Sequence, residues 1–345
     1  MSETHRKFPF ATNFFRFFSG TEPYLSAMFP RLPLVVLVSL TIWAASACGA
    51  ERYIFGMIAK SQGNQFFEAA HSGANDAARE LGKKYGIEIR IDWRTPAEED
   101  AQKQAVFVEQ LVLNGVDGII VSCSDANKLT DTINKAVAQG IPAVTFSGDA
   151  PSSRRMVSLG IDDFKFGEET FEAVAGLLQG KGIVAAIDGN PNAANLQQRA
   201  AGCRAAAKKY PRIKLLDVYY HKETPADAVA RIEQVMQANP DITGWGFLGG
   251  WPLFTDHALN WRPGAVKCVS VDALPPELVY VRSGHVQILL SQDVHAYGYR
   301  AVELLVEKLH VKKSAPAAIE NSALTAVTPE NVDAFAKNWE KWLPK

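Results

Sequence analysis

Residues 51–345 are predicted to form two α/β lobes, each built on a doubly wound parallel sheet. Short, β-branched apolar runs alternate with helical patterns along this segment, as is typical of parallel strands that are covered on both faces. Ten strands are too many for one small sheet and show no eightfold barrel repeat, so two sheets of about five strands are the natural division. The runs lie at 53–58, 87–92, 118–122, 143–146, 156–159, 183–187, 214–220, 245–248, 266–271 and 286–290.

The segments between the runs carry apolar residues at helical spacing. In the first segment the pattern covers 67–81, and Gly82 is predicted to end the helix. The pattern returns at 129–137, and Gly140 is predicted to end that helix before the next strand. Doubly wound sheets bind ligands at the carboxyl ends of their strands, so the residues directly after each run are the candidates for a site.

The composition is that of a globular protein without a charge bias. With 345 residues, 47% of them hydrophobic and 21% charged, the chain is long enough for two domains with a core each. It holds 36 Lys and Arg against 37 Asp and Glu, so no excess of charge indicates a nucleic acid or an anionic membrane surface as a partner.

Residues 1–50 are predicted to be an N-terminal extension and signal peptide that lies outside the fold. Arg31 precedes an uncharged apolar core at 32–47 and small residues follow, which is the order of a secretory signal. The core is shorter than the roughly 20 residues that a membrane-spanning helix needs. The sequence therefore predicts export.

The processing of this segment stays open between three routes. Ala45-Ser46-Ala47 fits an ordinary signal-peptidase site, whereas Ala-Ser-Ala-Cys48 loosely resembles a lipobox, in which Cys48 would become a lipidated N-terminus, although the usual Leu is missing. An uncleaved anchor helix is the third route. Residues 1–27 are either a long n-region or the product of an upstream start codon that the cell does not use.

The other three cysteines are predicted to be buried, small apolar residues. Cys123, Cys203 and Cys268 lie far apart and form no CxxC pair. Their odd number argues against a disulfide framework in an exported protein, and their spacing argues against zinc.

Polar and aromatic side chains follow the first and fourth runs. Asn64 can donate to and accept from hydroxyls, and an aromatic ring such as Phe66 packs on the C–H face of a sugar. Phe67 is in phase with the helical core pattern, which leaves Phe66 free to face outward. Asp149 is either a turn residue or a carboxylate that accepts two hydroxyls, and we favour the second interpretation.

Later strand ends add further candidates. Arg199 lies in the first turns of a helix, where a cation opposes the helix dipole, and this unfavourable place suggests a ligand role. Trp251 follows two glycines, which let the backbone approach closely, and offers a large flat surface. Asp272 and Gln292 end the ninth and tenth runs.

No motif for catalysis, cofactor binding or metal binding accompanies these residues. The loop after the sixth run, at 188–199, contains no GxGxxG or Walker A pattern, so it does not predict a phosphate site. The sequence contains no GxSxG or HExxH pattern, and its seven histidines are scattered. The strand-end set can hydrogen-bond a polyhydroxylated molecule and stack on it, but it has no evident means of activating a nucleophile. We therefore expect a binding protein that is not an enzyme and that carries no cofactor or metal.

Across 51–345 the chain resembles the periplasmic sugar-binding proteins of the ribose/galactose-binding type. These are type I periplasmic binding proteins, the substrate-binding proteins of ABC transporters. The order and spacing of the matching pieces carry the resemblance. The pieces are Asn64-Gln65-Phe66-Phe67 (Asn-Pro-Phe-Phe in the family), GVDGIIVSCSD, AVAQGIPAVTF, Arg199-Ala-Ala-Gly202, SVDALPPEL, SQDVHAYGYRAVELL and TPENVDAF.

The resemblance implies two Rossmann-like lobes joined by a three-stranded hinge. Its crossovers are expected near 160–162, 291–293 and 321–324. They give an N-terminal lobe of 51–161 plus 293–322 and a C-terminal lobe of 162–292 plus 323–345. The resemblance also implies sugar contacts at Asn64, Phe66, Phe67, Arg199, Asp272 and Gln292.

Two departures from the family indicate a ligand other than ribose. Ribose binders carry Asp-Arg after the fourth strand, where this chain has Ser147-Gly148-Asp149. They carry Asn after the eighth strand, where this chain has Gly249 before Gly250-Trp251. Losing a charged fork and an amide leaves space, so we expect a hexose or modified sugar, with Trp251 in the wall of its site.

The predicted function is that of a periplasmic, monomeric receptor for a monosaccharide. Hinge closure on the sugar would deliver it to an ABC permease in the inner membrane. The alternatives are a sensory module that feeds a chemoreceptor or kinase, and an exported carbohydrate enzyme. A transcription regulator is excluded because the export signal stands where a helix-turn-helix would be needed.

Overall fold

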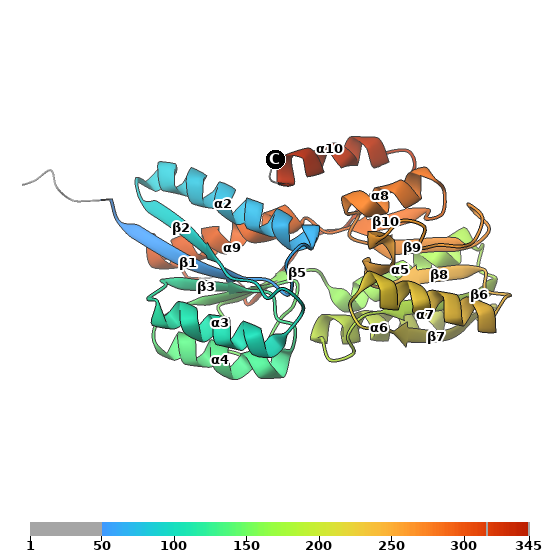
Figure 1. The fold of residues 1–345 in the computed structure, drawn as a ribbon, viewed down its shortest axis with the longest axis horizontal. Coiled ribbons are helices and arrows are strands. Elements are labelled where there is room, and N and C mark those ends of the chain that lie inside the picture. Colours follow the sequence, from blue (N-terminus) through green and yellow to red (C-terminus); the bar gives the residue numbers. More distant parts are fainter. Residues whose placement is uncertain (1–49, 315–316, 344–345) are drawn as a thin grey trace, which may run out of the picture. The chain divides into compact units, whose positions relative to one another are not determined.

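The computed structural model describes residues 50–314 and 317–343, and its strands form two six-stranded sheets (Figure 1). The predicted signal segment, its cleavage site and Cys48 lie outside the described residues. The first sheet has the strand order β11-β5-β4-β3-β1-β2, and the second has the order β12-β10-β9-β8-β6-β7. Both sheets thus have the same topology. The second strand of each sheet lies on one side of the first, and the next three strands follow one another on the other side, so the strand order reverses next to β1 and next to β6.

The first sheet is parallel throughout. It consists of β1 (Arg52–Ile58), β2 (Glu88–Trp93), β3 (Gly118–Val121), β4 (Ala143–Phe146), β5 (Val157–Gly160) and β11 (Ile319–Asn321). The second sheet is parallel except for the antiparallel pair of β10 and β12. It consists of β6 (Gly182–Asp188), β7 (Ile213–Tyr220), β8 (Gly244–Phe247), β9 (Lys267–Val271), β10 (Ile288–Ser291) and β12 (Thr325–Val327).

The prediction of two doubly wound sheets is confirmed. All ten apolar runs form strands at nearly the predicted bounds, and the central strands β3, β4 and β8 are buried along their whole length. The sequence did not reveal β11 and β12, since each has only three residues, most of them exposed, and lacks a continuous apolar pattern.

Helices cover the sheets in pairs. On the first sheet α2 (Gln65–Tyr85) packs beside α9 (Val294–Leu309), and α3 (Ala101–Leu113) beside α4 (Ala126–Ala138) on the other face (Figure 1). On the second sheet α5 (Asp163–Leu177) packs beside α6 (Ala194–Ala207). The other helices that follow strands of the second sheet are α7 (Pro225–Ala238) and α8 (Pro275–Arg282). The short 3₁₀ helix η2 (Trp251–Phe254) contacts both of them.

The predicted end of the first helix is wrong by one turn. Helix α2 continues through Gly82 to Tyr85, and Gly86, with φ 68°, is its left-handed cap. Gly82 is a glycine for another reason, because a Cβ there would lie 2.9 Å from the carbonyl oxygen of Ile87. The second predicted helix ends as expected, with α4 stopping at Ala138 before Gly140 at φ 84°.

The chain passes between the two sheets three times, at 161–162, 292–293 and 322–324. Two of these passages are tied together, since the Ser322 amide donates to the Gly160 carbonyl at 2.7 Å. The last helix, α10 (Val332–Trp342), packs against both α2 and α8. Its Trp339 Nε1 donates to the Ala273 carbonyl at 2.8 Å, at the end of β9.

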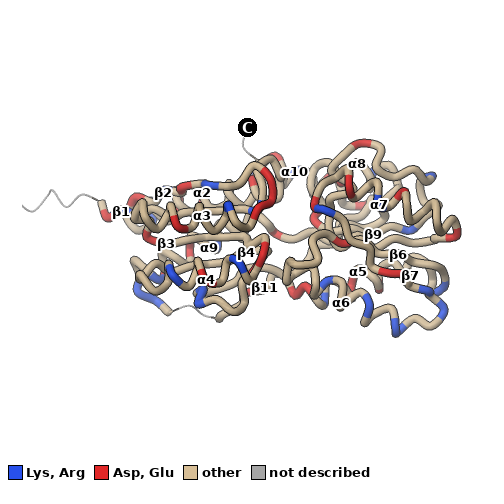
Figure 2. The backbone as a smooth tube through the Cα atoms, turned by 60° about the horizontal axis from the view of Figure 1, so that its bottom comes forward, with Lys and Arg blue, Asp and Glu red and all other residues tan. Residues whose placement is uncertain are grey.

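The prediction for the cysteines is confirmed. Cys123, Cys203 and Cys268 are buried and unpaired, and burial raises the pKa of each thiol above its usual range. Basic and acidic residues are interspersed over the described chain (Figure 2). No helix within the described ranges is long and apolar enough to cross a membrane.

Candidate functional site

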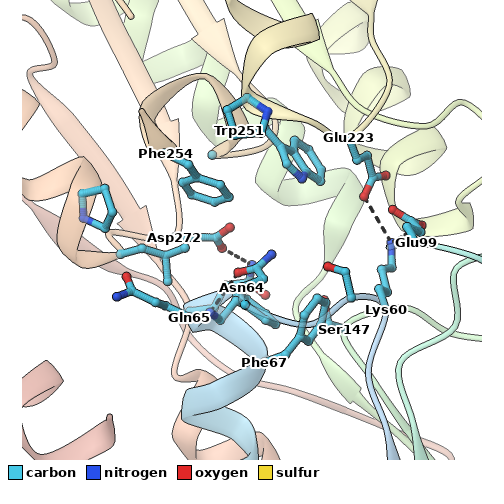
Figure 3. Close-up of a pocket in the computed structure, with 18 of the residues that line it drawn as sticks. Lys60, Asn64, Gln65, Phe67, Glu99, Ser147, Glu223, Trp251, Phe254 and Asp272 are labelled. Carbon is cyan, nitrogen blue, oxygen red and sulfur yellow. Dashed lines mark hydrogen bonds and ion pairs between the residues drawn. The ribbon is translucent and has the colours of Figure 1, made fainter. Parts of the chain in front are cut away.

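A cavity of about 390 Å³ opens where the carboxyl ends of the two sheets meet (Figure 3). Loops after strands of both sheets contribute to its lining, as expected where doubly wound sheets reverse direction. The structure brings seven of the eight predicted site residues together there. These are Asn64, Phe66, Phe67, Arg199, Trp251, Asp272 and Gln292.

The start of α2 supplies one wall. Asn64 is the N-cap of this helix, and its Oδ1 accepts from the Phe66 amide at 3.0 Å, which leaves the Nδ2 hydrogens for a ligand. The rings of Phe66 and Phe67 meet edge to face, with centroids 5.2 Å apart, and Phe67 also packs on Phe146. Both phenylalanines are almost fully buried and line the cavity, so Phe67 belongs to the core and to the site at once.

The opposite wall is formed by Trp251 and Phe254 of η2, which face Asn64 and Phe67 across the cavity (Figure 3). Gly249, two residues after β8, leaves room for Trp251, because a Cβ on this glycine would overlap the indole ring. Gly250 leaves room in the same way for the buried carboxyl of Glu277. The two glycines therefore seat protein side chains that shape the wall.

Arg199 of α6 is the buried cation of the site. Its Nε donates to Asp163 and its Nη1 to the Leu248 carbonyl, both at 2.8 Å, and the guanidinium stacks on Phe166 at 4.8 Å. Burial alone would lower the pKa of Arg199, but Asp163 and Asp272 outweigh it and hold that pKa raised. Arg199 is therefore charged and rigid where it meets the cavity.

Carboxylates surround this cation. Burial raises the pKa of Asp163, although Arg199 offsets part of the effect. Burial likewise raises the pKa of Asp188, at the end of β6, to about 7, and one of its oxygens has no hydrogen-bond partner. Such groups keep their charge only while Arg199 compensates them.

Asp272 connects the cavity to the hinge. Gln292 Nε2 donates to its Oδ1 at 2.7 Å, and the Tyr297 hydroxyl donates to Gln292 Oε1 at 3.2 Å. Tyr297 also meets the Ser322 hydroxyl, in a passage between the sheets, at 3.1 Å. Burial raises the pKa of Asp272 to about 6, against the opposing effects of Arg199 and Gln292. A ligand on this carboxylate therefore touches a hydrogen-bonded chain that ends in the hinge.

The structure differs from the expectation for Asp149, which does not line the cavity. Its carboxylate accepts hydrogen bonds from Arg155 Nε at 2.5 Å, from Arg155 Nη2 at 2.6 Å and from the Thr145 hydroxyl. Burial opposes ionisation, but these hydrogen bonds outweigh it and lower the pKa of Asp149. The residue that reaches the cavity from this loop is Ser147, in a left-handed conformation at φ 58°.

Three charged lining residues were missed by the sequence analysis: Lys60, Glu99 and Glu223. Lys60 Nζ lies 3.6 Å from Glu99 and 3.8 Å from Glu223 (Figure 3). Burial would lower the pKa of Lys60, but the two carboxylates raise it; burial also raises the pKa of Glu99 to about 8. The glutamates follow the edge strands β2 and β7, whose ends we had not considered, and reading every strand end would have found them.

The family model for the periplasmic binding protein domain matches residues 55–313 of this chain. The chain belongs to the periplasmic binding protein family. Its relatives include the ribose import binding protein of Bacillus subtilis, 24% identical over 83% of this chain and 97% of the relative. The D-apiose import binding protein of Actinobacillus succinogenes is 25% identical over 60% of this chain and 65% of the relative.

Solved structures of the family share this fold of two parallel-sheet lobes. An ABC transporter solute-binding protein of Burkholderia graminis in complex with D-arabinose superposes with a TM-score of 0.76. It is 26% identical, over 82% of this chain and 97% of that one. A solute-binding protein of Agrobacterium vitis bound to α-D-tagatopyranose has a TM-score of 0.77 at 19% identity, over 85% of this chain and 99% of that one.

The lining of the cavity contains aromatic rings on which a ligand can stack, as well as hydrogen-bond donors and acceptors. Its described lining includes serines but neither histidine nor cysteine, and no group of three or more potential metal ligands occurs within the described residues. Because its pKa of about 8 keeps Glu99 mostly protonated at neutral pH, the charges in the lining are Glu223 and Asp272 against Lys60 and Arg199. Asp163 and Asp188 stand behind Arg199 and offset its charge, so the cavity holds no surplus of positive charge for an anionic ligand.

Proposed function

We propose that this protein is the exported solute-binding component of an ABC importer and that it binds a neutral monosaccharide in this cavity. The observation that carries the proposal is the cavity between two aromatic walls, with Arg199 of α6 and Asp272, which follows β9, in its lining. Aromatic faces accept the C–H side of a sugar ring, and a carboxylate accepts two hydroxyls. The names of the relatives, which are import and solute-binding proteins, support the same function, so we do not retain the sensory alternative.

We further propose that the lobes comprise 51–161 plus 293–322 and 162–292 plus 323–345, and that they close about the three passages. The strands of each sheet fall within these ranges, which supports the boundaries. Closure would complete the hydrogen bonds to the sugar, and the closed form would be what an inner-membrane permease recognises. In this proposal the protein acts as a monomer and catalyses nothing.

The side chains proposed to contact the sugar all line the cavity. They are Asn64, Phe66, Phe67, Arg199, Trp251, Asp272 and Gln292, together with Lys60 and Ser147. Asp149 is not retained as a contact, because Arg155 and Thr145 occupy its oxygens. Export is proposed to follow from residues 1–50. Mass spectrometry of the N-terminus would distinguish the three routes, which are lipidation of Cys48, simple cleavage and an uncleaved anchor helix.

Titration calorimetry against a sugar panel tests the proposal. We expect a neutral hexose or modified sugar to bind more tightly than D-ribose, because Ser147 and Gly249 replace hydrogen-bonding residues of ribose binders. D-galacturonate and D-glucose 6-phosphate should bind at least tenfold more weakly than the neutral parents, because Lys60 and Arg199 are already matched by carboxylates and no cation remains to offset the cost of burying the added charge. Ribose as the tightest ligand would refute the specificity, and binding of no sugar would refute the function.

The affinity should fall on acidification. The ionised form of Asp272 is the acceptor for sugar hydroxyls, and its pKa in the free protein is about 6. Affinity should therefore be full above this pKa and about tenfold weaker at pH 5 than at pH 8, since protonation competes with the sugar. Calorimetric titrations across this range check the expectation. A constant affinity from pH 8 to pH 5 would mean that Asp272 does not bind the sugar as a carboxylate.

A further inference from the structure

We propose that the natural ligand is larger than one sugar ring. Its first ring would fill the cavity described above, and a second hydroxylated unit, as in a disaccharide or glycoside, would occupy a neighbouring cavity beside His221 and Glu99. This inference rests on the proposed function and extends its substrate class.

The second cavity has a volume of about 780 Å³ and adjoins the first. The two share lining residues, namely Ser61, Gln62, Glu99, Glu223 and Pro225. The remaining lining comes largely from the loops after β2, β6 and β7, at 97–98, 190–191 and 220–224. A ligand bound in the first cavity can therefore extend into the second.

His221 gives the second cavity a hydrogen-bond acceptor that has no partner. Its Nδ1 lies 2.5 Å from the Lys222 carbonyl, which can only accept, so Nδ1 carries the hydrogen and Nε2 presents a lone pair. Nε2 is buried and finds no partner in the described chain. Burial lowers the pKa of His221, which keeps the imidazole neutral, and its ring packs edge to face on Trp251 with centroids 5.4 Å apart. The histidine is therefore a fixed acceptor next to the wall of the first cavity.

Glu99 adds a second buried polar group on the boundary between the cavities, and its pKa of about 8 means that at neutral pH this carboxyl can donate as well as accept. Its buried Oε1 has no hydrogen bond and lies 3.6 Å from Lys60 Nζ. The neighbouring Glu223 is already engaged, since its Oε1 accepts from the Asn190 amide at 3.1 Å. Buried acceptors without partners favour a ligand that brings donors. Hydroxyl groups donate and accept and carry no charge, which suits a cavity whose lining contains Glu98 and Glu223 as well as Lys222 and Arg231.

The rest of the lining fits the remainder of a sugar. Ala97, Pro191 and Pro225 are small or apolar and can contact C–H groups, while Asn190 and Gln62 can donate or accept. Both cavities fall within the usual size range of small-molecule sites, roughly 300–1,000 Å³. The alternative occupant of the second cavity is water alone, and the experiment below separates the two.

The test compares monosaccharides with disaccharides that contain them. Titration calorimetry would use D-glucose with maltose and cellobiose, D-galactose with lactose and melibiose, and D-mannose with mannobiose. We expect at least one disaccharide to bind tenfold or more tightly than each of its component sugars. His221→Asn keeps a donor near the Lys222 carbonyl but deletes the Nε2 acceptor, so it should remove most of this advantage and leave monosaccharide affinity within about threefold.

A second variant makes the test independent of the histidine. Ala97 is exposed, so Ala97→Trp should fold normally while filling the second cavity, and it should weaken the disaccharide selectively. His71→Asn is the matched control, because His71 also packs on a tryptophan, Trp93, but lines neither cavity. It should leave both affinities unchanged.

Two outcomes would overturn the inference while leaving the proposed function intact. One is that no disaccharide binds more tightly than its component monosaccharides. The other is that Ala97→Trp leaves the disaccharide advantage unchanged. Binding of neither class of sugar would instead contradict the proposed function itself.

Discussion

Replacing Arg199 with methionine should lower the free energy of unfolding by about 3–5 kcal/mol, the usual cost of removing one partner from a buried ion pair. The guanidinium forms an ion pair with Asp163, and its charge offsets part of the rise in pKa that burial causes at Asp188 and Asp272. Its loss leaves these carboxylates to shift their pKa values upward and take up protons. Sugar binding should be lost with it, because the charged wall of the cavity disappears. Chemical denaturation at pH 7, followed by tryptophan fluorescence, measures the change.

Arg204→Met is the matched control for this experiment. Arg204 lies on the same helix, α6, and its pair with Asp217 is exposed on both sides, at 43% and 58% of the side-chain surface. An exposed pair contributes about 0–1 kcal/mol, so the control should unfold nearly like the parent. Equal effects of the two substitutions would show that the buried charge cluster does not depend on Arg199.

Replacing Asp272 with alanine should weaken sugar binding about 5- to 150-fold, which corresponds to the roughly 1–3 kcal/mol lost when a buried polar group is left without its partner. Asp272 accepts from Gln292 on one oxygen only, so the other is available to sugar hydroxyls. The alanine variant removes that acceptor and releases Gln292. Calorimetric titration with the tightest sugar of the panel measures the loss.

Asp149→Ala provides the contrast. This residue is also a partly buried aspartate after a strand, but its carboxylate is bound by Arg155 and lies outside the cavity lining. We expect it to cost stability, while affinity stays within about threefold of the parent. If Asp149→Ala abolished binding and Asp272→Ala did not, the assignment of the two carboxylates would be reversed.

The fold could be predicted from sequence because its central strands are buried on both faces. A strand such as β3, with no exposed residue, must be apolar along its length, and β4 and β8 meet the same condition. The edge strands β2 and β7 are partly exposed and contain charged residues, but they are long enough for their apolar residues to be recognised. The edge strands β11 and β12 escaped because a three-residue, exposed strand meets no such condition. The end of α2 was misplaced because Gly82 resembles a helix terminator, although its glycine is required by the close approach of Ile87.

The site was predicted in part because parallel sheets place their strand ends together. That rule was sufficient for Asp272, directly after β9, and for Asn64, in the loop after β1. Arg199 lies within α6, and its unfavourable place in the first turns of that helix is what indicated it. It does not tell which oxygen or nitrogen is free. The Asn64 oxygen is used as a helix cap, and both polar ends of Gln292 already have partners within the protein.

Competition from other side chains explains the error at Asp149. The sequence shows an aspartate after a strand but not that Arg155, six positions further on, turns back to bind it. Pairing of this kind depends on loop conformation, in this case on Ser147 at positive φ. Lys60 was missed for a similar reason, because the sequence does not show which carboxylates lie beside it. Its partners Glu99 and Glu223 come from the loops after two edge strands in different sheets.

The hydrogen-bonded chain from Asp272 through Gln292 and Tyr297 to Ser322 gives closure a physical route. Gln292 and Ser322 lie in two of the three passages between the sheets, and the Ser322 amide donates to Gly160, which directly precedes the third. A sugar that orders Asp272 therefore acts on residues within the hinge. Differential binding of this kind is what a ligand needs in order to shift a receptor between states.

The central claim is that the cavity between the carboxyl ends of the two sheets is a sugar site. A crystal structure of the protein grown with the tightest sugar of the panel tests it most directly. We expect one ring between Trp251 and the phenylalanines of α2, with hydroxyls hydrogen-bonded to Asp272 and Arg199. Sugar density elsewhere on the protein, with this cavity holding only water, would show that the cavity is not the sugar site.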